Sequence, residues 1–301
     1  MQKKSIRVCF IFNPVADRNR SSRHINWLNR EAGKRWEEFE IVITQKNQDI
    51  VGLAREKAGA FDIVVACGGD GTINQVVNGI VGTSASLGVL PIGSGNDFVK
   101  TMHLNKTLPE CMEILHQGYQ TNIDLIRYKG DCDGWCANTI GIGLDGWANY
   151  YARNYKFLRG HAVYVLGALK AAIKFRGSNM NLKIDEVQKN DHFLMITVCN
   201  GKWEGGNFFV APDADMTDGL LDLLTINNLP LPTVLSYLPR FRWGPSPNMK
   251  GVKLRQCKDL EVTSEIPLAV HSDGEHLSKT VRYLKLSVKK NVLPVITPKN
   301  Y

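Results

Sequence analysis

The first third of the chain alternates between short β-branched apolar runs and segments in which apolar residues recur at helical spacing. We expect the apolar runs to be strands, at residues 6–12, 39–44, 61–67 and 86–92. The intervening and following segments are expected helices, at residues 21–38, 48–59, 72–81 and 107–117. This order predicts a parallel sheet covered by helices on both faces. We therefore expect a doubly wound α/β domain over residues 1–122.

From about residue 120 the pattern changes to short strand-like runs separated by turn residues. These runs lie at 121–128, 135–143, 181–187, 192–200, 207–212, 220–226, 253–264, 267–274 and 281–288. One long helical stretch, 147–175, interrupts them. Several short strands in succession predict an antiparallel β sandwich. We place this second domain at residues 123–289, with the tail 290–301 returning to the first domain, and expect a site in the cleft between the domains.

Charge is distributed unevenly along the 301 residues, whose formal net charge is +8. Residues 146–184 and 223–258 contain several Lys and Arg but no Asp or Glu. Basic surfaces attract nucleic acid, anionic membranes or phosphorylated ligands. No zinc-finger, RNP-type or helix-turn-helix pattern accompanies the charge, so we expect no nucleic-acid partner. Aromatic and aliphatic residues interleaved with the basic ones are compatible with a membrane face; they are Tyr155, Phe157, Leu158, Phe241 and Trp243. Each segment taken alone favours a solvated basic rim.

The composition otherwise indicates an ordinary globular protein, with 44% hydrophobic and 22% charged residues. No apolar run approaches the ~20 residues needed to span a bilayer, and the start of the chain does not resemble a signal peptide. The seven cysteines are odd in number and mostly lie in strand-like runs, which is typical of reduced core thiols. We therefore expect a cytoplasmic protein without a transmembrane segment.

The polar motifs of the first domain all follow expected strands. Because parallel sheets bind ligands outside the carboxyl ends of their strands, these motifs should lie together. They are "NP" at 13–14, Thr44, "GGDGT" at 68–72 and "GSGND" at 93–97. The glycine turns lack both the G-x-G-x-x-G pattern and the Walker lysine, so phosphates would be held by backbone amides and a helix N-terminus.

A carboxylate, Asp70, in the middle of such a turn has two explanations. It can act through a cation, because a carboxylate beside polyphosphate is repulsive unless a cation bridges them. Alternatively, the segment is an ordinary tight turn, in which Gly68, Gly69 and Gly71 take positive φ and Asp70 caps the following helix. Asn96 and Asp97 in the next motif present the same choice between a helix cap and a site.

Six motifs in this order resemble those of the bacterial diacylglycerol-kinase-like lipid kinases, part of the superfamily of diacylglycerol, sphingosine and NAD kinases. They are "FNP" at 12–14, "GGDGTINQV" at 68–76, "GSGNDF" at 93–98, "NG" at 200–201, "APDADMTDGLLD" at 211–222 and "DGE" at 273–275. The resemblance implies a nucleotide-binding α/β domain and a β-sandwich lipid domain. It also implies transfer of the γ-phosphate of ATP to the hydroxyl of a diacylglycerol-like lipid with Mg²⁺. An NAD kinase or a non-catalytic lipid- or nucleotide-binding homologue is the alternative.

The resemblance also assigns roles to individual residues. Glu275 would be the base that accepts the hydroxyl proton, Asp273 would support it, and Asp70 would act through Mg²⁺. A second Mg²⁺ would be held by Asp215, Asp218 and the backbone carbonyl of Leu220, and an ordinary acidic turn is the alternative there. The residues implied to hold ATP are Asn13, Thr44, Gly68, Gly69, Asp70, Gly71, Thr72, Asn74, Ser94, Asn96 and Asp97.

The chain departs from the family pattern at two places. The first loop reads "NPVADRNR", whereas relatives usually carry a small residue and glycine after Asn-Pro, and Arg18 and Arg20 would substitute electrostatically for that tighter turn. Gln75 stands where relatives commonly carry Glu. Neither position is assigned to chemistry. The expected partners are a lipid substrate at a membrane surface, bound peripherally, and a second copy of the chain in a homodimer.

Overall fold

The computed structural model describes residues 6–16, 21–93, 95–153, 161–246 and 248–299. The chain forms two compact units. The first comprises the N-terminal part up to Ile123 together with the tail from Asn291, and the second runs from Asp124 to Lys290. The first unit is therefore built from two separate stretches of the chain.

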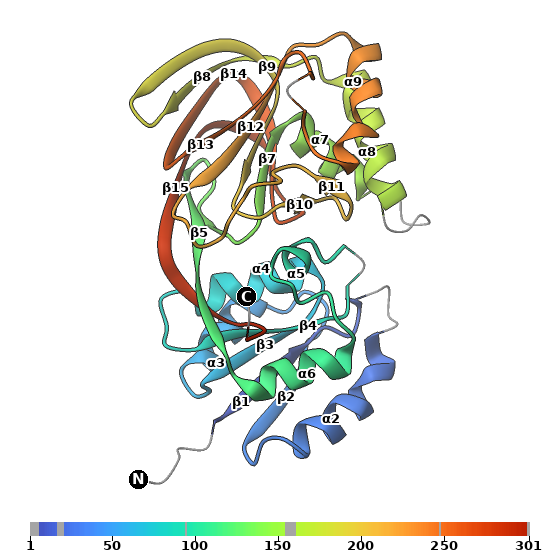
Figure 1. The fold of residues 1–301 in the computed structure, drawn as a ribbon, viewed down its shortest axis with the longest axis vertical. Helices are drawn as coiled ribbons and strands as arrows, with labels where there is room; N and C mark the ends of the chain where they lie inside the picture. Colours follow the sequence, from blue (N-terminus) through green and yellow to red (C-terminus); the bar gives the residue numbers. More distant parts are fainter. Residues whose placement is uncertain (1–5, 17–20, 94, 154–160, 247, 300–301) are drawn as a thin grey trace. The chain divides into compact units, whose positions relative to one another are not determined.

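A parallel sheet forms the centre of the first unit (Figure 1). Its strands are β1 (Val8–Phe12), β2 (Phe39–Ile43), β3 (Ile63–Gly68) and β4 (Ser86–Pro91), in the order β4-β3-β1-β2. All five residues of β1 are buried, as expected for a central strand covered on both faces. The helices are η1 (Ser21–His24), α2 (Ile25–Gly33), α3 (Ile50–Ala58), α4 (Asp70–Ile80), α5 (Asp97–Thr101) and α6 (Leu108–Gln117). The expected doubly wound α/β fold is confirmed.

The tail completes this sheet. Near the end of β15 (Glu275–Ile296), Val295 pairs in parallel with Leu87 of β4. Ile296 is fully buried and belongs to the same core as Val8, Phe10 and Phe12. The last strand of the described chain is therefore part of the core of the first unit.

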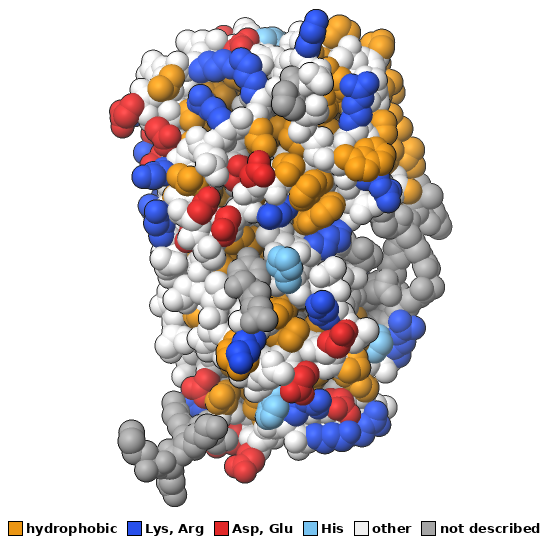
Figure 2. Space-filling view, viewed as in Figure 1, with side chains coloured by type: hydrophobic (Ala, Val, Ile, Leu, Met, Phe, Trp, Pro, Cys, Tyr) orange, Lys and Arg blue, Asp and Glu red, His pale blue; other side chains and the backbone are white. Residues whose placement is uncertain are grey.

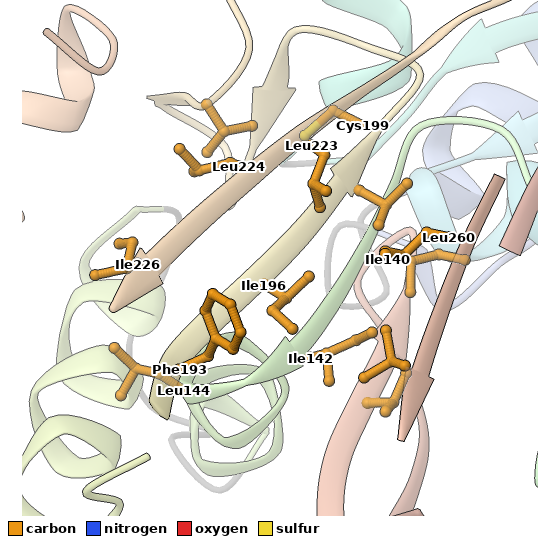
Figure 3. Close-up of a cluster of buried hydrophobic side chains, with 14 of the residues drawn as sticks. Ile140, Ile142, Leu144, Phe193, Ile196, Cys199, Leu223, Leu224, Ile226 and Leu260 are labelled. Carbon is orange, nitrogen blue, oxygen red and sulfur yellow. The ribbon is translucent and has the colours of Figure 1, made fainter. Parts of the chain in front are cut away.

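The second unit is predominantly antiparallel. Its strands are β5 (Gln120–Gly130, which begins in the first unit), β6 (Gly134–Cys136), β7 (Thr139–Gly143), β8 (Ser178–Ile184), β9 (Val187–Cys199), β10 (Trp203–Glu204), β11 (Phe208–Phe209), β12 (Leu221–Asn227), β13 (Val252–Cys257), β14 (Asp259–Ser272) and most of β15. The main path runs β13-β12-β9-β7-β14-β15, and β8 pairs with both β9 and β14. Apolar side chains from these strands form one large core, which includes Ile142, Phe193 and Ile196 (Figure 3).

The long helical stretch expected at 147–175 is wrong in its extent. Two helices occupy this region, α7 (Leu144–Ala152) and α8 (His161–Lys174), and residues 154–160 between them lie outside the described residues. The short helices α9 (Leu231–Tyr237) and η2 (Arg240–Arg242) are also present and were not expected from the sequence.

Candidate functional site

The expected polar residues of the first unit do follow its strands. The backbone N–H of Asn13, directly after β1, donates to the carbonyl of Cys67 at 3.0 Å, and its side-chain amide donates to Thr72 Oγ1 at 3.0 Å. Thr44 follows β2 and its N–H donates to the carbonyl of Phe12. Thr44 and Thr72 are both buried. The ends of β1, β2 and β3 are therefore tied to one another and to the first turn of α4.

The two glycine turns touch each other at their backbones. A Cβ atom on Gly93 would collide with the Cα of Gly69, and the reciprocal contact of a Cβ on Gly69 with Gly93 Cα would be 3.2 Å. None of Gly68, Gly69 and Gly71 has a positive φ, so the expectation of left-handed glycines in this turn is wrong. Gly71 lies in α4 and Gly69 is extended at φ −100° and ψ −169°, so the requirement for glycine at position 69 comes from its close contact with the backbone of Gly93.

Asp70 caps α5, whereas the sequence suggested that it caps the helix that directly follows its own turn. The helix α4 begins at Asp70 itself, and its N-cap is Gly69, which offers no side chain. Asp70 Oδ1 instead accepts hydrogen bonds from the backbone N–H groups of Asp97 at 2.8 Å and Phe98 at 3.4 Å, in the first turn of α5. The carboxylate replaces the usual N-cap of α5, because Asn96 has a left-handed backbone and its amide donates to the carbonyl of Gly93 instead.

The surroundings of Asp70 fit a bound polyphosphate. The eleven-residue helix α4 begins at the glycine turn, and the dipole at a helix N-terminus favours an anion there. Asn96 Oδ1 is buried without a hydrogen-bond partner among the described residues. Asn74 and Gln75 lie half-buried on α4. The Asp97 carboxylate forms an ion pair with Lys100 Nζ at 3.1 Å. Ser94 lies outside the described residues. Glycines, a helix N-terminus and oxygen donors are the groups that hold phosphate and a hard divalent cation.

Glu275 is the first residue of β15 and directly follows the two-residue turn of the β14–β15 hairpin. Ser272 and Glu275 are paired across the turn, and its central residues Asp273 and Gly274 both have positive φ, 49° and 79°. Asp-Gly is a preferred sequence for a hairpin of this type. The Glu275 carboxylate forms an ion pair with Arg153, with Oε2 at 2.9 Å from Nη2, and both side chains are well exposed. A short, rigid turn therefore presents an accessible carboxylate.

The Asp273 side chain is buried and hydrogen-bonded to the backbone. Its buried carboxylate accepts hydrogen bonds from three successive backbone N–H groups, of Ala137, Asn138 and Thr139, at 2.8–3.0 Å. The Cys136 thiol also donates to it, and burial followed by the nearby Asp273 raises the pKa of that thiol. Asp273 thus fixes the hairpin to residues 137–139, at the start of β7.

The acidic turn holds Asp215, Asp218 and Leu220 within six residues. Asp215 Oδ1 accepts from the N–H and the hydroxyl of Thr217, and Asp218 Oδ1 accepts from the N–H of Leu220 at 2.8 Å. The fully buried Asp124 accepts from the N–H of Gly219 at 2.7 Å, which anchors the turn to the protein interior. Oxygen ligands of this kind suit Mg²⁺.

The pKa of a nearby carboxyl is raised by its burial and, to a smaller extent, by the negative charge of this turn. Burial and the neighbouring Asp218 raise the pKa of Asp222 to about 6. A divalent cation in the turn would relieve this repulsion. The composition and charge of the turn therefore fit a cation.

The fold also brings together a buried cluster of one histidine and two carboxylates that was not predicted from the sequence. His271 Nε2 lies 3.3 Å from Asp145 Oδ1 and 3.0 Å from Glu204 Oε1, and His271 is only 2% exposed. Burial opposes a charge on His271, but the two carboxylates outweigh it and raise its pKa to about 10. The three residues come from α7, β10 and β14, so no local sequence pattern could have connected them.

The acid-free segments carry basic and exposed apolar side chains together. Lys170 and Lys174 of α8 lie over the ring of Tyr151, and Ile173 on the same helix is 59% exposed. Trp243, directly after η2, is 76% exposed. Figure 2 shows Lys and Arg side chains among hydrophobic ones over the region of α8 and α9. Tyr155, Phe157 and Leu158 lie outside the described residues, and none of the described helices is both long and apolar enough to cross a membrane.

Comparison with known proteins agrees with this architecture. Residues 7–128 match the diacylglycerol kinase catalytic domain, and residues 138–297 match the YegS C-terminal NAD kinase beta sandwich-like domain. A probable YegS-like lipid kinase of Yersinia pseudotuberculosis is 30% identical over 278 residues, 86% of this chain and 87% of the relative.

Solved structures show the same fold. A putative diacylglycerol kinase of Bacillus anthracis superimposes with a TM-score of 0.83 at 19% identity, covering 100% of both chains. An NAD kinase of Archaeoglobus fulgidus in complex with ATP superimposes with a TM-score of 0.55 at 14% identity, covering 97% of this chain and 94% of that one. The fold is thus that of the diacylglycerol and NAD kinases. Within this class, the chain belongs to the family of diacylglycerol-kinase-like lipid kinases.

Proposed function

We propose that this protein transfers the γ-phosphate of ATP to a hydroxyl group of diacylglycerol or a related lipid. The observation that carries this proposal is the contact between the two glycine turns, with the Asp70 carboxylate beside them. Gly69 and Gly93 are in close backbone contact at the N-terminus of α4, and backbone amides at a helix N-terminus are suited to binding phosphate. Family membership supports a nucleotide as phosphate donor and a lipid as acceptor.

In the proposed reaction, Glu275 accepts the proton of the lipid hydroxyl. The hydroxyl oxygen forms a bond to the γ-phosphorus, and the bond from that phosphorus to the β,γ-bridging oxygen breaks, which releases ADP. Glu275 is suited to this role because its carboxylate is accessible and its backbone is fixed by the Asp273–Gly274 turn. A base in phosphoryl transfer mainly orients the nucleophile.

The nucleotide would be held by the residues that follow the four parallel strands. Asn13, Thr44, Thr72, Asn74 and Asn96 offer hydroxyl and amide groups, and the glycine turn offers backbone N–H groups. Mg²⁺ bound through Asp70 would neutralise negative charge on the phosphates. A second Mg²⁺ would be held by Asp215, Asp218 and the carbonyl of Leu220, where it would stabilise the acidic turn.

The lipid would be reached from an anionic membrane surface. The basic side chains of α8 and η2, together with the exposed Ile173 and Trp243, support peripheral binding. Anionic membranes attract basic residues by about 1 kcal/mol for each Lys or Arg near the surface. Aromatic residues such as Trp243 favour the membrane interface.

A transfer assay with radiolabelled ATP tests the proposal. The purified chain is incubated with ATP, Mg²⁺ and micelles that contain diacylglycerol, phosphatidylglycerol, a sphingoid base or a polyprenol, with NAD in a separate reaction. We expect label in one lipid, abolished by EDTA. Label in NAD without label in any lipid, or no transfer to any acceptor, would overturn the proposal. Gel filtration of the same sample tests the expected homodimer.

A further inference from the structure

One face of α7 is docked along the hairpin that carries Glu275. Asp145, Asn149 and Arg153 are spaced four residues apart, so they share this face of the helix. Asp145 contacts His271 before the turn, the Asn149 amide donates to the carbonyl of Gly274 within the turn at 2.6 Å, and Arg153 pairs with Glu275 after it. Two positions one turn apart in α7, together with the C-cap residue of the helix, thus contact three successive parts of one hairpin.

Close packing of backbones fixes α7 in this position. A Cβ atom on Gly146 would collide with the carbonyl oxygen of Ala269 in β14. The helix therefore approaches β14 more closely than a side chain at this position would allow. The His271 contact is buried and bridges Asp145 to Glu204, so it restrains the first turn of the helix from a second side.

Asn149 is the residue of this face that acts on the turn itself. It is buried, and its amide donates to the backbone carbonyl between Gly274 and Glu275. This peptide group sets the direction in which the Glu275 side chain leaves the backbone. The Arg153 pair is exposed, and such pairs contribute little to stability.

We propose that Asn149 is a positioning residue for Glu275, with α7 as the rigid element that aims this carboxylate at the acceptor hydroxyl. The inference rests on the proposed function, in which Glu275 is the base. Asn149 touches neither the acceptor nor the nucleotide in this proposal. Its effect on the reaction passes entirely through the orientation of Glu275.

A double-mutant cycle tests this role. Misplacement of a reacting group by about 1 Å can cost about a hundredfold in rate, so we expect Asn149→Ala to lower kcat by roughly ten- to a hundredfold. The KM for ATP should stay within about twofold of the wild type, since the nucleotide residues are untouched. In a Glu275→Gln background, Asn149→Ala should have no further effect, because residues that act as a unit are not additive.

Asn227→Ala is a matched control. The Asn227 amide also donates one hydrogen bond at 2.6 Å, to Asp191, in the same unit but away from the hairpin. This variant should keep the wild-type kcat. If Asn149→Ala does not fold, Asn149→Asp keeps the size of the side chain while removing the amide donor. An unchanged kcat in the folded Asn149 variant, or an equal loss of rate with and without Glu275, would overturn the positioning role.

Hydrogen exchange separates this inference from the proposed function. The backbone N–H groups of residues 272–276 should exchange faster in Asn149→Ala than in wild type, whatever reaction the protein catalyses. Unchanged exchange there would overturn the inference alone. If Glu275→Gln kept full activity, the assignment of the base would fail, while the exchange result would still decide whether Asn149 holds the turn.

Discussion

The Asp70 carboxylate and the backbone N–H of Asp97 are joined by a hydrogen bond of 2.8 Å between two glycine-containing turns. Asp70 therefore has a structural contact in addition to its proposed role at the phosphates. Its Oδ1 atom orders the first turn of α5, and the α5 N-cap residue Asn96 does not provide this bond. Substitutions of Asp70 must separate these two contributions.

Asp70→Asn and Asp70→Ala should differ in stability but not in activity. An asparagine keeps an oxygen acceptor for the α5 amides, whereas alanine removes it at a cost of about 1 kcal/mol in the free energy of unfolding. Both variants lose the charge proposed to act through Mg²⁺, so both should lower phosphate transfer by about a hundredfold or more. Urea unfolding and the transfer assay measure the two effects. Full activity in Asp70→Asn would contradict the proposed role of the charge.

Gly93→Ala should weaken nucleotide binding because the new methyl group would collide with Gly69. Overpacking of this kind costs about 1–3 kcal/mol in stability, and we expect the Kd for ATP, measured by calorimetry, to rise at least about tenfold. Gly33→Ala in α2 is the control, since its methyl group would lie 3.8 Å from the ring of Phe39. Equal Kd values for the Gly93 and Gly33 variants would argue against a phosphate site between the turns.

Mg²⁺ should stabilise the wild-type protein in the absence of nucleotide. Above saturation, each tenfold rise in Mg²⁺ should add about 1.4 kcal/mol to the free energy of unfolding from the acidic turn. Asp218→Asn should remove this increment, whereas Asp213→Asn, an exposed carboxylate of the same turn without an assigned ligand role, should keep most of it. Thermal melts over a Mg²⁺ titration provide the measurement. Identical behaviour of the two variants would leave the turn as an ordinary acidic turn.

Because of the buried His271, the free energy of unfolding should depend on pH in the alkaline range. The pKa of His271 is raised from its ordinary 6.5 to about 10, so its contribution is complete below pH 6.5 and is lost as the pH rises towards 10. The free energy of unfolding should therefore fall more steeply over this window in the wild type than in His271→Gln. Urea unfolding at several pH values tests this. Parallel pH profiles would mean that His271 is already neutral in the folded protein.

The basic and aromatic surface near η2 should control membrane binding. Replacing Arg240 and Arg242 by Gln should weaken binding to phosphatidylglycerol vesicles by up to about 1 kcal/mol for each residue, and Trp243→Ala should weaken it further. The exposed Arg30 of α2 provides a matched control through Arg30→Gln. Vesicle sedimentation measures binding. Equal loss in the control and the η2 variants would place the membrane contact elsewhere or assign it to net charge alone.

The features that could be predicted from the sequence are those that depend on residues close together along the chain. The strands β1 to β4 follow from local apolar runs, and the positions of Asn13, Thr44 and the glycine turns follow from a rule about parallel sheets. Residues such as Asp145, Glu204 and His271 could not be connected, because their contacts join segments that only the folded sheet brings together.

Short helices and the ends of helices could not be predicted from local sequence patterns either. The helix α5 has five residues, too few to show a helical period, so the cap provided by Asp70 could not be assigned to it. The division of 147–175 into α7 and α8 was missed for a related reason, because the whole stretch is rich in helix-compatible apolar residues.

The pairing of Val295 with Leu87 has a consequence for how the protein is made. The ribosome synthesises β1 to β4 first, but the strand segment that lies beside β4 emerges only after the whole second unit has been translated. Until then the edge of β4 and its apolar surface lack their partner. The sheet of the N-terminal unit is therefore completed only after translation of the C-terminal unit.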